Sequence, residues 1–305
     1  MIKLNIPSYI IKWTAEFLKN RRFCVDVNGE KSTLRDIRAG VPQGAVLSPI
    51  LFSIFINDIP IENSTNRSYG LLFADDLAKI FIFKKPGKLE LLVNKYLKNI
   101  VKWLQKWRLK MNVSKTKYTI FSKSANTRKD FTFSLYDMKL KRDPNPKFLG
   151  VTFDESLSFG PQVKEIKEKC IKRLNILKIL SHKSWHLKTN ILLNIYKSLI
   201  RSIIDYNSFI LKSLSIANLN TLQIIQNKAI KSIFKLRYDF PSELLSGISG
   251  MVDISTRMST LCKNYFDKAF ISNNQLMALL KEEYNRSYNA IEKNDKKKTL
   301  LFYYK

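Results

Sequence analysis

Two adjacent aspartates, Asp75 and Asp76, stand between two apolar runs in Tyr69-Gly-Leu-Leu-Phe-Ala-Asp-Asp-Leu-Ala-Lys-Ile80. Carboxylates supply the oxygen ligands that divalent cations such as Mg²⁺ prefer, and two of them raised out of an apolar sheet need such a counter-charge. Asp also favours turns, because its side chain hydrogen-bonds the local backbone. An ordinary turn is therefore the competing interpretation of this pair.

A second candidate segment, Gly40-Val-Pro-Gln-Gly-Ala-Val-Leu-Ser-Pro-Ile50, carries two glycines four residues apart with Pro42 between them. This pattern favours a backbone that passes close to a ligand. Free N–H groups of such a loop could bind phosphate or sugar groups. Glycines that merely shape a turn explain the pattern equally well.

The elements that position these residues follow from apolar periodicity. The runs flanking the aspartates predict two buried strands that turn at residues 74–76. Ser48 as a capping hydroxyl and Pro49 at the first helical position predict the start of a buried helix. Further expected elements are helices at 7–19 and 87–110, a hairpin at 22–38 turning at Asn28-Gly29, strands at 118–121 and 131–135, and helices from 161 onward, with apolar stripes at 163–177, 191–199 and 219–233.

The charge balance indicates a polyanionic partner. The chain of 305 residues holds 53 Lys and Arg against 25 Asp and Glu, a net charge of +28. Such a field attracts nucleic acid and makes its binding salt-sensitive. A membrane surface is the competing partner, but Asn57 and Asp58 interrupt the apolar stretch at 46–61, which is too short to span a bilayer. We expect no membrane contact and, without a secretion-signal pattern, a location in the nucleus or cytoplasm.

Helices of the second half carry basic residues opposite their apolar stripes. The densest set is Lys164, Lys167, Lys169, Lys172, Arg173 and Lys178. Solvation explains such a face as well as nucleic-acid binding does.

Other residues able to bind metals are weaker candidates. Asp26 and Asp36 fall in the expected hairpin, where alternation with apolar residues is typical of a solvated strand face. His182 and His186 have no neighbouring Cys, Asp or Glu to complete a zinc site. The isolated cysteines, which lack metal-site spacing, indicate free thiols: Cys24, Cys170 and Cys262.

Taken in order, these segments resemble the reverse transcriptase domain of non-LTR retrotransposons, the jockey-like group of insects and other animals. The resemblance rests on the blocks Ala39-Gly-Val-Pro-Gln-Gly-Ala-Val-Leu-Ser-Pro-Ile-Leu-Phe52, Ile56-Asn-Asp-Ile-Pro60, Phe73-Ala-Asp-Asp76, Trp107-Arg-Leu-Lys-Met-Asn-Val-Ser-Lys-Thr116, Phe148-Leu-Gly-Val151 and Leu222-Gln-Ile-Ile-Gln-Asn-Lys228. A group II intron or retron polymerase is the alternative within enzymes. Phe73, where those polymerases have tyrosine, and the last block weigh against it.

The resemblance implies catalytic roles for three residues. Asp75 would be a ligand of the catalytic Mg²⁺, or Mn²⁺, and Asp76 would support the same metal site. Lys115 would neutralise or protonate the leaving pyrophosphate. A solvated turn residue after Asn112 is an equal interpretation of that lysine.

The same resemblance implies binding roles for two other segments. The loop that contacts the incoming nucleotide and the template base would comprise Gly40, Pro42, Gln43 and Gly44. The primer strand would be positioned by Phe148 and Gly150. The implied substrates are an RNA template, a DNA primer and deoxynucleoside triphosphates.

The family's fold implies an α+β chain. A partial polymerase palm, with helices packed on an antiparallel sheet, would occupy residues 1–158. An all-helical thumb at 159–240 and a helical C-terminal region of unknown role at 241–305 would follow. The family's fingers and the strand with a further catalytic aspartate are expected upstream of this chain. Polymerases hold two ions about 3.5–4 Å apart, with ligands on both sides, so we expect this chain alone to polymerise poorly or not at all.

Two further classes of function remain open on the sequence alone. The chain could be a non-catalytic nucleic-acid-binding remnant whose thumb still grips duplexes, or the product of a decayed reading frame. Tight, steeply salt-dependent binding without primer extension would favour the remnant.

Overall fold

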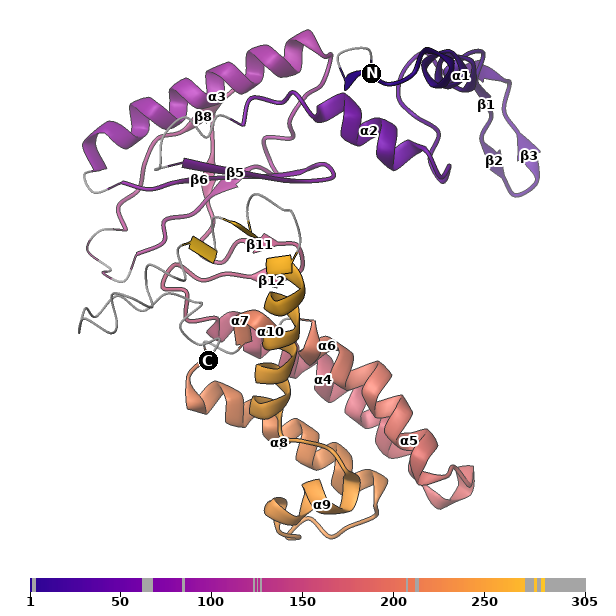
Figure 1. Cartoon of the computed structure of the whole chain (residues 1–305), viewed down its shortest axis with the longest axis vertical. Helices are drawn as coiled ribbons and strands as arrows, with labels where there is room; N and C mark the ends of the chain where they lie inside the picture. Colours follow the sequence, from indigo (N-terminus) through magenta and orange to yellow (C-terminus); the bar gives the residue numbers. More distant parts are fainter. Residues whose placement is uncertain are drawn as a thin grey trace. The chain divides into compact units, whose positions relative to one another are not determined.

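The computed structural model describes residues 1, 4–61, 68–83, 86–122, 124, 126, 128–206, 208–211, 214–271, 277–278 and 281–282. Its contacts divide the chain into two compact units, which are described separately (Figure 1). The first unit comprises Met1–Thr116 and Phe131–Leu140, and the second comprises Lys117–Asp130 and Lys141–Lys305. Helices combined with small, mostly antiparallel ladders confirm the α+β class. The functional division at residues 158 and 240 stays a prediction.

The first unit holds three α-helices, one 3₁₀ turn and eight strands among its described residues. In chain order they are α1 (Ser8–Leu18), β1 (Arg22–Phe23), β2 (Asp26–Val27), β3 (Glu30–Lys31), β4 (Arg35–Asp36), α2 (Ser48–Ile56), β5 (Ser68–Phe73), β6 (Asp76–Phe81), η2 (Pro86–Lys88), α3 (Leu89–Lys106), β8 (Ser134–Leu135) and β9 (Met138–Lys139).

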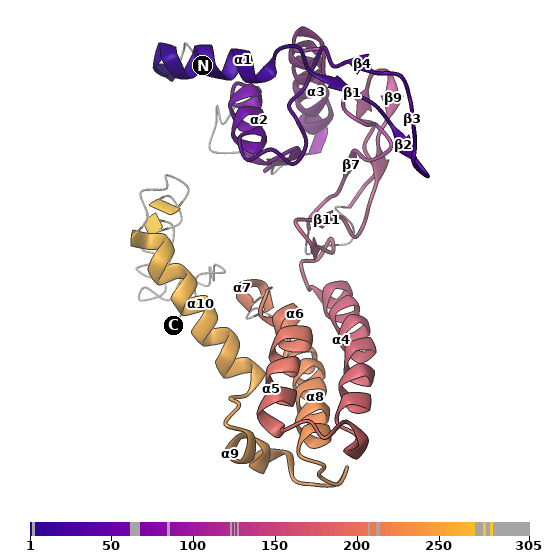
Figure 2. The same ribbon diagram turned by 90° about the vertical axis from the view of Figure 1, so that its right-hand side faces the viewer.

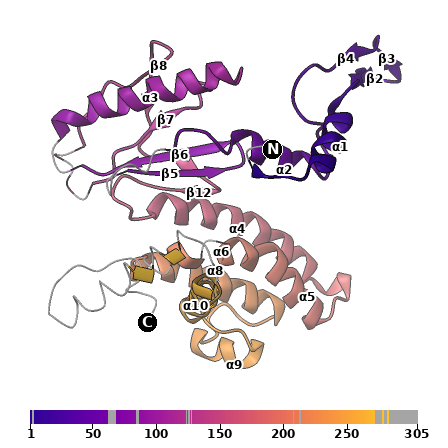
Figure 3. The ribbon, with the colours of Figure 1, turned by 45° about the horizontal axis from the view of Figure 1, so that its top comes forward.

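Helix α3 is the main packing element of this unit and lies along the β5–β6 hairpin (Figure 3). The helix predicted at 87–110 is confirmed over Leu89–Lys106, and its residues Val93, Leu97, Ile100 and Leu104 are buried at helical spacing. The ring of Phe81 meets Tyr96 edge-on, with 5.7 Å between centroids. This contact fixes the aspartate-bearing hairpin against a rigid helix.

A second hairpin braces α3 through its backbone. The amide nitrogen of Asn94 donates to the carbonyl of Thr132 at 3.0 Å, and its oxygen accepts from the N–H of Ser134 at 2.9 Å. One side chain thereby pairs with two backbone groups at the start of β8, which pairs with β9.

The predicted hairpin at 22–38 is confirmed. Strand β1 pairs with β4, and β2 pairs with β3 across the turn at Asn28-Gly29. Both turn residues have positive φ, +55° for Asn28 and +88° for Gly29, as a tight hairpin turn of this kind requires.

Several burial expectations for this unit are wrong. Strands β5 and β6 are half exposed, since among the described residues they pair only with each other and Phe73 keeps 62% of its surface accessible. Helix α2 is apolar but only partly buried, with Ile50 57% exposed and Ile56 buried. Its Ser48 makes no capping bond to the helix; the hydroxyl donates instead to the carbonyl of Pro42.

The second unit is mainly helical. Its described elements are β7 (Lys117–Tyr118), β10 (Lys141–Arg142), β11 (Lys147–Phe148), β12 (Val151–Thr152), α4 (Gly160–Leu180), η4 (Lys183–Trp185), α5 (Thr189–Tyr196), the π-helix η5 (Lys197–Arg201), α6 (Ser202–Asp205), α7 (Ser208–Leu211), α8 (Ile216–Ile233), η6 (Ser242–Leu244), α9 (Leu245–Ser249) and α10 (Ile254–Ile271). Helices α4, α5, α6 and α8 run side by side (Figure 2).

The core of this unit lies between those helices. Cys170, Leu177, Tyr196, Leu222 and Ala229 have no accessible surface. Burying a large apolar side chain contributes about 1.5–3 kcal/mol. The hydroxyl of Tyr196 donates to the side-chain oxygen of Gln226 at 2.9 Å, so these two buried polar groups pair with each other.

Three further expectations need correction, one for the strands of both units and two for the helices of this unit. The antiparallel sheet expected for the palm occurs, among the described residues, as six separate two-stranded ladders, one of them parallel. Ile171, assigned to the stripe of α4, is 41% exposed. The helix expected through Leu199 changes to a π-helix, and Arg173 donates to the carbonyl of Leu199 at 2.6 Å, which stabilises that irregular turn.

None of the helices in the described ranges combines the length and the apolar composition needed to cross a membrane.

Candidate functional site

Asp75 and Asp76 lie at the turn of the β5–β6 hairpin, as the sequence predicted. Phe73 pairs with Asp76, so the turn itself is Ala74-Asp75. Ala74 has φ +50°, a left-handed conformation that costs an alanine about 1–2 kcal/mol. Strain of this kind persists where the surrounding ladder imposes it, and it is common at functional sites.

Both carboxylates are free to bind a cation. They are exposed, and neither makes a hydrogen bond or ion pair to another described residue. Two unengaged carboxylates fit Mg²⁺, which binds through one or two carboxylates together with substrate phosphates. No cluster of three or more His, Cys, Asp or Glu able to hold a metal occurs in the described part of the chain. Substrate oxygens and water would complete the coordination.

The glycine loop owes its glycines to backbone conformation. Gly40 has φ +79° and Gly44 has φ +82°, a region that favours glycine. A Cβ added at either position would meet nothing within 4 Å. The protein itself therefore makes no close approach at these positions, and the space beside the loop is open to a ligand.

Two contacts hold this loop in place. The guanidinium of Arg21 donates to the carbonyl of Gly40 at 2.5 Å, and the hydroxyl of Ser48 donates to that of Pro42. Gln43, which lies between Gly40 and Ser48, is exposed and makes no hydrogen bond with a described residue.

Lys115 sits in a turn organised by Asn112. The side-chain oxygen of Asn112 accepts from the backbone N–H groups of Ser114 and Lys115 at 3.0 and 3.3 Å. The Lys115 side chain is exposed and makes no ion pair with Asp75 or Asp76. Asn112 therefore has a structural role in this turn, and the role of Lys115 in catalysis stays a prediction.

Phe148 and Gly150 belong to the second unit, in the tight β11–β12 hairpin. Phe148 pairs with Val151, and the turn residues Leu149 and Gly150 have φ +46° and +79°. The hydroxyl of Tyr206 donates to the carbonyl of Leu149 at 3.0 Å. A Cβ on Gly150 would lie 3.4 Å from the Tyr206 ring. Close packing and positive φ therefore both favour glycine here.

Glu165 of α4 anchors this hairpin. Its carboxylate accepts from Lys147 at 2.6 Å, from Lys169 at 2.7 Å and from the hydroxyl of Thr152 at 2.9 Å. The hydrogen bond from Lys147, followed by that from Lys169, lowers the pKa of Glu165 to about 2. The charge-assisted bonds from Lys147 and Thr152 fix the hairpin to the helix that follows it, and Lys169 pairs with Glu165 within that helix.

The basic face of α4 divides into engaged and free residues. Lys169 pairs with Glu165, and Arg173 donates to the carbonyl of Leu199. Among the described residues, the lysine side chains on this helix that are exposed and unpaired are those of Lys164, Lys167, Lys172 and Lys178.

The weaker candidates have structural roles. Asp26 accepts from the backbone N–H of Gly29 at 3.1 Å, which closes the hairpin turn, and Asp36 pairs with Arg22 at 3.1 Å. The Nδ1 of His182 bonds Ser184 and caps the turn η4. Burial raises the pKa of the Cys170 thiol to about 11, so this thiol stays protonated at neutral pH.

Sequence reasoning missed the residues that hold the candidate segments from a distance. Arg21 fixes the glycine loop, Tyr206 supports the β11–β12 turn, and Ile61 packs against Gly70 of β5. The only sequence signal was a glycine inside a strand, which is typical of close approach by another segment.

Comparison with known proteins gives one consistent result. A profile of the family "Reverse transcriptase (RNA-dependent DNA polymerase)" matches residues 1–153, just over half of the 305 residues. Curated relatives from Drosophila melanogaster include the probable RNA-directed DNA polymerase from transposon BS, 27% identical over 88% of this chain, and the RNA-directed DNA polymerase from mobile element jockey, 24% identical over 90%. The probable RNA-directed DNA polymerase from transposon X-element is 26% identical over 76%.

The chain spans about 30% of the length of the first two relatives and 26% of the third. The family match includes the glycine loop, Asp75, Asp76, Lys115 and the β11–β12 turn. Together with the free carboxylates at the hairpin turn, it confirms the resemblance seen in the sequence: this chain belongs to the reverse transcriptase family.

Proposed function

We propose that this chain supplies the metal-binding turn, the nucleotide loop and the primer-positioning hairpin of an RNA-directed DNA polymerase from a non-LTR retrotransposon. The single observation that carries the proposal is the pair of exposed, unengaged carboxylates at the strained β5–β6 turn, within a family match that runs from residue 1 to 153. The reaction adds a deoxynucleotide to a primer 3′-hydroxyl on an RNA template, and pyrophosphate leaves.

The residues divide this work. Asp75 is the principal metal ligand, and Asp76, at the first position of β6, supports it. A divalent cation bound there, Mg²⁺ or Mn²⁺, would stabilise charge on the attacking and leaving oxygens. In this proposal Lys115 balances the charge of the departing pyrophosphate.

The binding segments orient the substrates. Gly40 to Gly44 present open backbone to the nucleotide, with Gln43 beside the template base. Phe148 and Gly150 position the primer from a hairpin that Glu165 and Tyr206 hold rigid. The thumb, at residues 159–240, would grip the duplex through the free lysines of α4. Work on RNA and DNA would place the protein in the nucleus or cytoplasm.

Primer extension tests the proposal. The chain is incubated with poly(rA), oligo(dT), dTTP and Mg²⁺ or Mn²⁺. Two adjacent carboxylates supply one side of a two-ion clamp, so we expect weak extension from this chain by itself. Asp75→Asn should abolish whatever extension occurs, whereas Asp58→Asn, an exposed carboxylate after α2, should leave it unchanged. Robust extension that survives Asp75→Asn would contradict the proposal.

A non-catalytic nucleic-acid-binding role is the second candidate, and the unpaired lysines of α4 favour it. Filter binding across a salt series separates the two functions. Tight binding of duplex with a steep salt dependence, and no extension with either cation, would support the binding role.

A further inference from the structure

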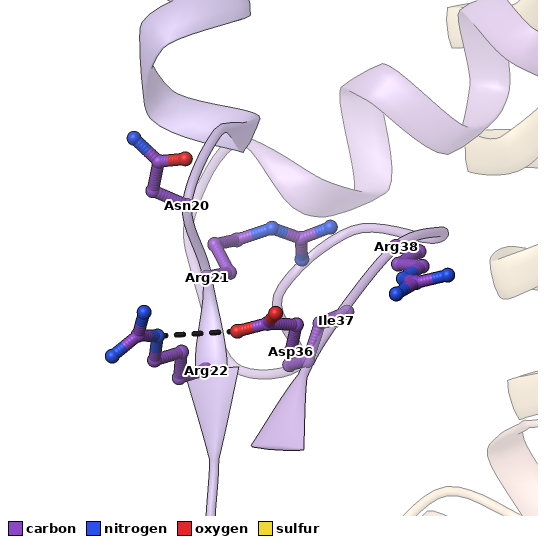
Figure 4. Close-up of a pocket in the computed structure, with 6 residues that line it drawn as sticks. All are labelled: Asn20, Arg21, Arg22, Asp36, Ile37 and Arg38. Atoms are coloured by element: carbon purple, nitrogen blue, oxygen red, sulfur yellow. Dashed lines mark hydrogen bonds and ion pairs between the residues drawn. The ribbon is translucent and has the colours of Figure 1, made fainter. Parts of the chain in front are cut away.

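A cavity of about 670 Å³ opens at the base of the β1–β4 hairpin in the first unit. It is lined by Asn20, Arg21, Arg22, Asp36, Ile37 and Arg38 (Figure 4). The lining contains three guanidinium groups and one carboxylate, so it carries a net charge of +2. An excess of positive charge of this kind attracts anions.

The single carboxylate is already neutralised. Arg22 binds Asp36, with 3.1 Å between Nε and Oδ1, and Figure 4 shows this pair on one side of the cavity. Arg21 extends toward the other side, where Arg38 lies. The positive charge of Arg21 and Arg38 is therefore left without a counter-charge from the lining.

These two arginines are prepared for a ligand in different ways. Arg21 is held by the carbonyls of Leu18, at 3.1 Å, and Gly40, at 2.5 Å, so the orientation of its guanidinium is fixed before a ligand arrives. Arg38 is exposed and bonds no described residue, so its donors are available. A guanidinium binds phosphate through a fork of parallel N–H donors, and arginine is preferred at phosphate sites for this reason.

Two phosphate ligands are possible on charge alone, a nucleoside triphosphate and a strand backbone. A triphosphate is bound with Mg²⁺, which takes carboxylate ligands, and the cavity's one carboxylate is occupied by Arg22. A phosphodiester needs no cation. We propose that Arg21 and Arg38 bind a backbone phosphate of a nucleic-acid strand and guide that strand past Gly40 into the nucleotide loop. This assignment rests on the proposed polymerase function and adds a strand-binding site to it.

The direct test is arginine modification by phenylglyoxal, read at each residue by mass spectrometry. The full chain is modified alone, with oligo(rA), with oligo(dA), with dTTP and Mg²⁺, and with inorganic phosphate. We expect either oligonucleotide to slow modification of Arg38 about tenfold. Arg35, exposed on β4 outside the cavity, is the internal control and should react at an unchanged rate.

A variant gives the second readout. Arg38 is exposed and makes no hydrogen bond or ion pair with a described residue, so Arg38→Gln should leave the fold intact. We expect it to make the salt dependence of oligo(rA) binding shallower by about one in slope, because one phosphate contact is lost. Arg35→Gln removes the same charge from the same hairpin and should leave the slope unchanged.

The outcomes are distinguishable from failure of the polymerase assignment. If a bound oligonucleotide leaves Arg38 reactive, or if Arg38→Gln and Arg35→Gln have equal effects, the cavity site is overturned. Neither result contradicts the proposed polymerase function, which the primer-extension assay tests separately. Protection of Arg38 by dTTP and Mg²⁺ but not by oligonucleotide would overturn the cavity site as well. Protection that persists in Asp75→Asn would show that the site acts apart from the metal ligands.

Discussion

Gly70 is the residue at which the aspartate hairpin is most tightly constrained. A Cβ added there would collide with Cγ2 of Ile61 and lie 3.1 Å from its Cβ. Because isoleucine is stiff at χ1, the backbone of one segment has to move. We expect Gly70→Ala to lower the free energy of unfolding by about 1–3 kcal/mol, as overpacking does. Urea denaturation followed by circular dichroism measures the change.

Two matched variants check this reasoning. A Cβ at Gly87 would meet nothing within 4 Å, so Gly87→Ala should cost much less. In an Ile61→Ala background the same Gly70→Ala change should also cost less, because the colliding methyl group is gone. Equal losses in all three comparisons would rule out the contact as the cause.

At the residue scale, the sequence predicted what local chemistry decides. The adjacent aspartates and the flanking apolar runs were sufficient to place Asp75 in a turn. The contact between Gly70 and Ile61 and the bond from Arg21 to Gly40 could not be predicted, because each joins segments whose approach depends on tertiary packing.

Glu165 and Gln162 are residues through which α4 holds the β11–β12 hairpin, and the titration of Glu165 gives this contact a pH dependence. Its folded pKa of about 2 lies below the ordinary value of 4.5. A carboxyl with a lowered pKa stabilises the fold above its unfolded pKa, and this stabilisation is lost as the pH falls from about 4.5 towards 2. We expect Glu165→Gln to cost about 1–2 kcal/mol at pH 7, a value reduced for its partial exposure.

The cost should shrink as the pH approaches 2, where the wild-type carboxyl is protonated too. Urea unfolding at several pH values measures it. Glu168→Gln is the control, since Glu168 is exposed on the same helix without a partner among the described residues. If the cost of Glu165→Gln is independent of pH, or equal to that of Glu168→Gln, Glu165 does not stabilise the hairpin through its charge.

At the element scale, the long periodic helices and their buried faces were predictable, and the burial of the strands was not. The stripes of α3 and α4 identified most of their buried positions, since 3.6-residue spacing is set by the helix itself. Apolar composition did not predict the partial exposure of β5 and β6, because the burial of a strand depends on what packs against it. The π-helix η5 could not be predicted from its own residues, because the side chain that stabilises it, Arg173, lies on another helix.

The net charge of +28 is a property of the whole molecule that favours nucleic-acid binding. If the free lysines of α4 contact duplex phosphates, replacing Lys164, Lys167 and Lys172 by Gln should make the salt slope shallower by about 2–3, or about 0.9 for each lost contact. Fluorescence anisotropy with a labelled RNA–DNA duplex across a salt series measures the slope.

The matched control removes the same charge from the solvent face of α3. Lys95, Lys98 and Lys102 are exposed and unpaired among the described residues, so their replacement by Gln should leave the slope nearly unchanged. Equal slopes for the two triple variants would mean that the charge acts diffusely, without a binding face on α4.

The central claim is that Asp75 and Asp76 hold the divalent cation, and iron-mediated cleavage tests it without requiring polymerase activity. Fe²⁺ replaces Mg²⁺ at oxygen-ligand sites, and with ascorbate and peroxide it cuts the neighbouring backbone. The fragments, sized by mass spectrometry with dTTP present, report where the cation sits. We predict a cut at residues 74–76 that excess Mg²⁺ suppresses, that Asp75→Asn abolishes and that Asp58→Asn leaves intact. Cleavage confined to other sites, or a cut at 74–76 that persists in Asp75→Asn, would contradict the assignment.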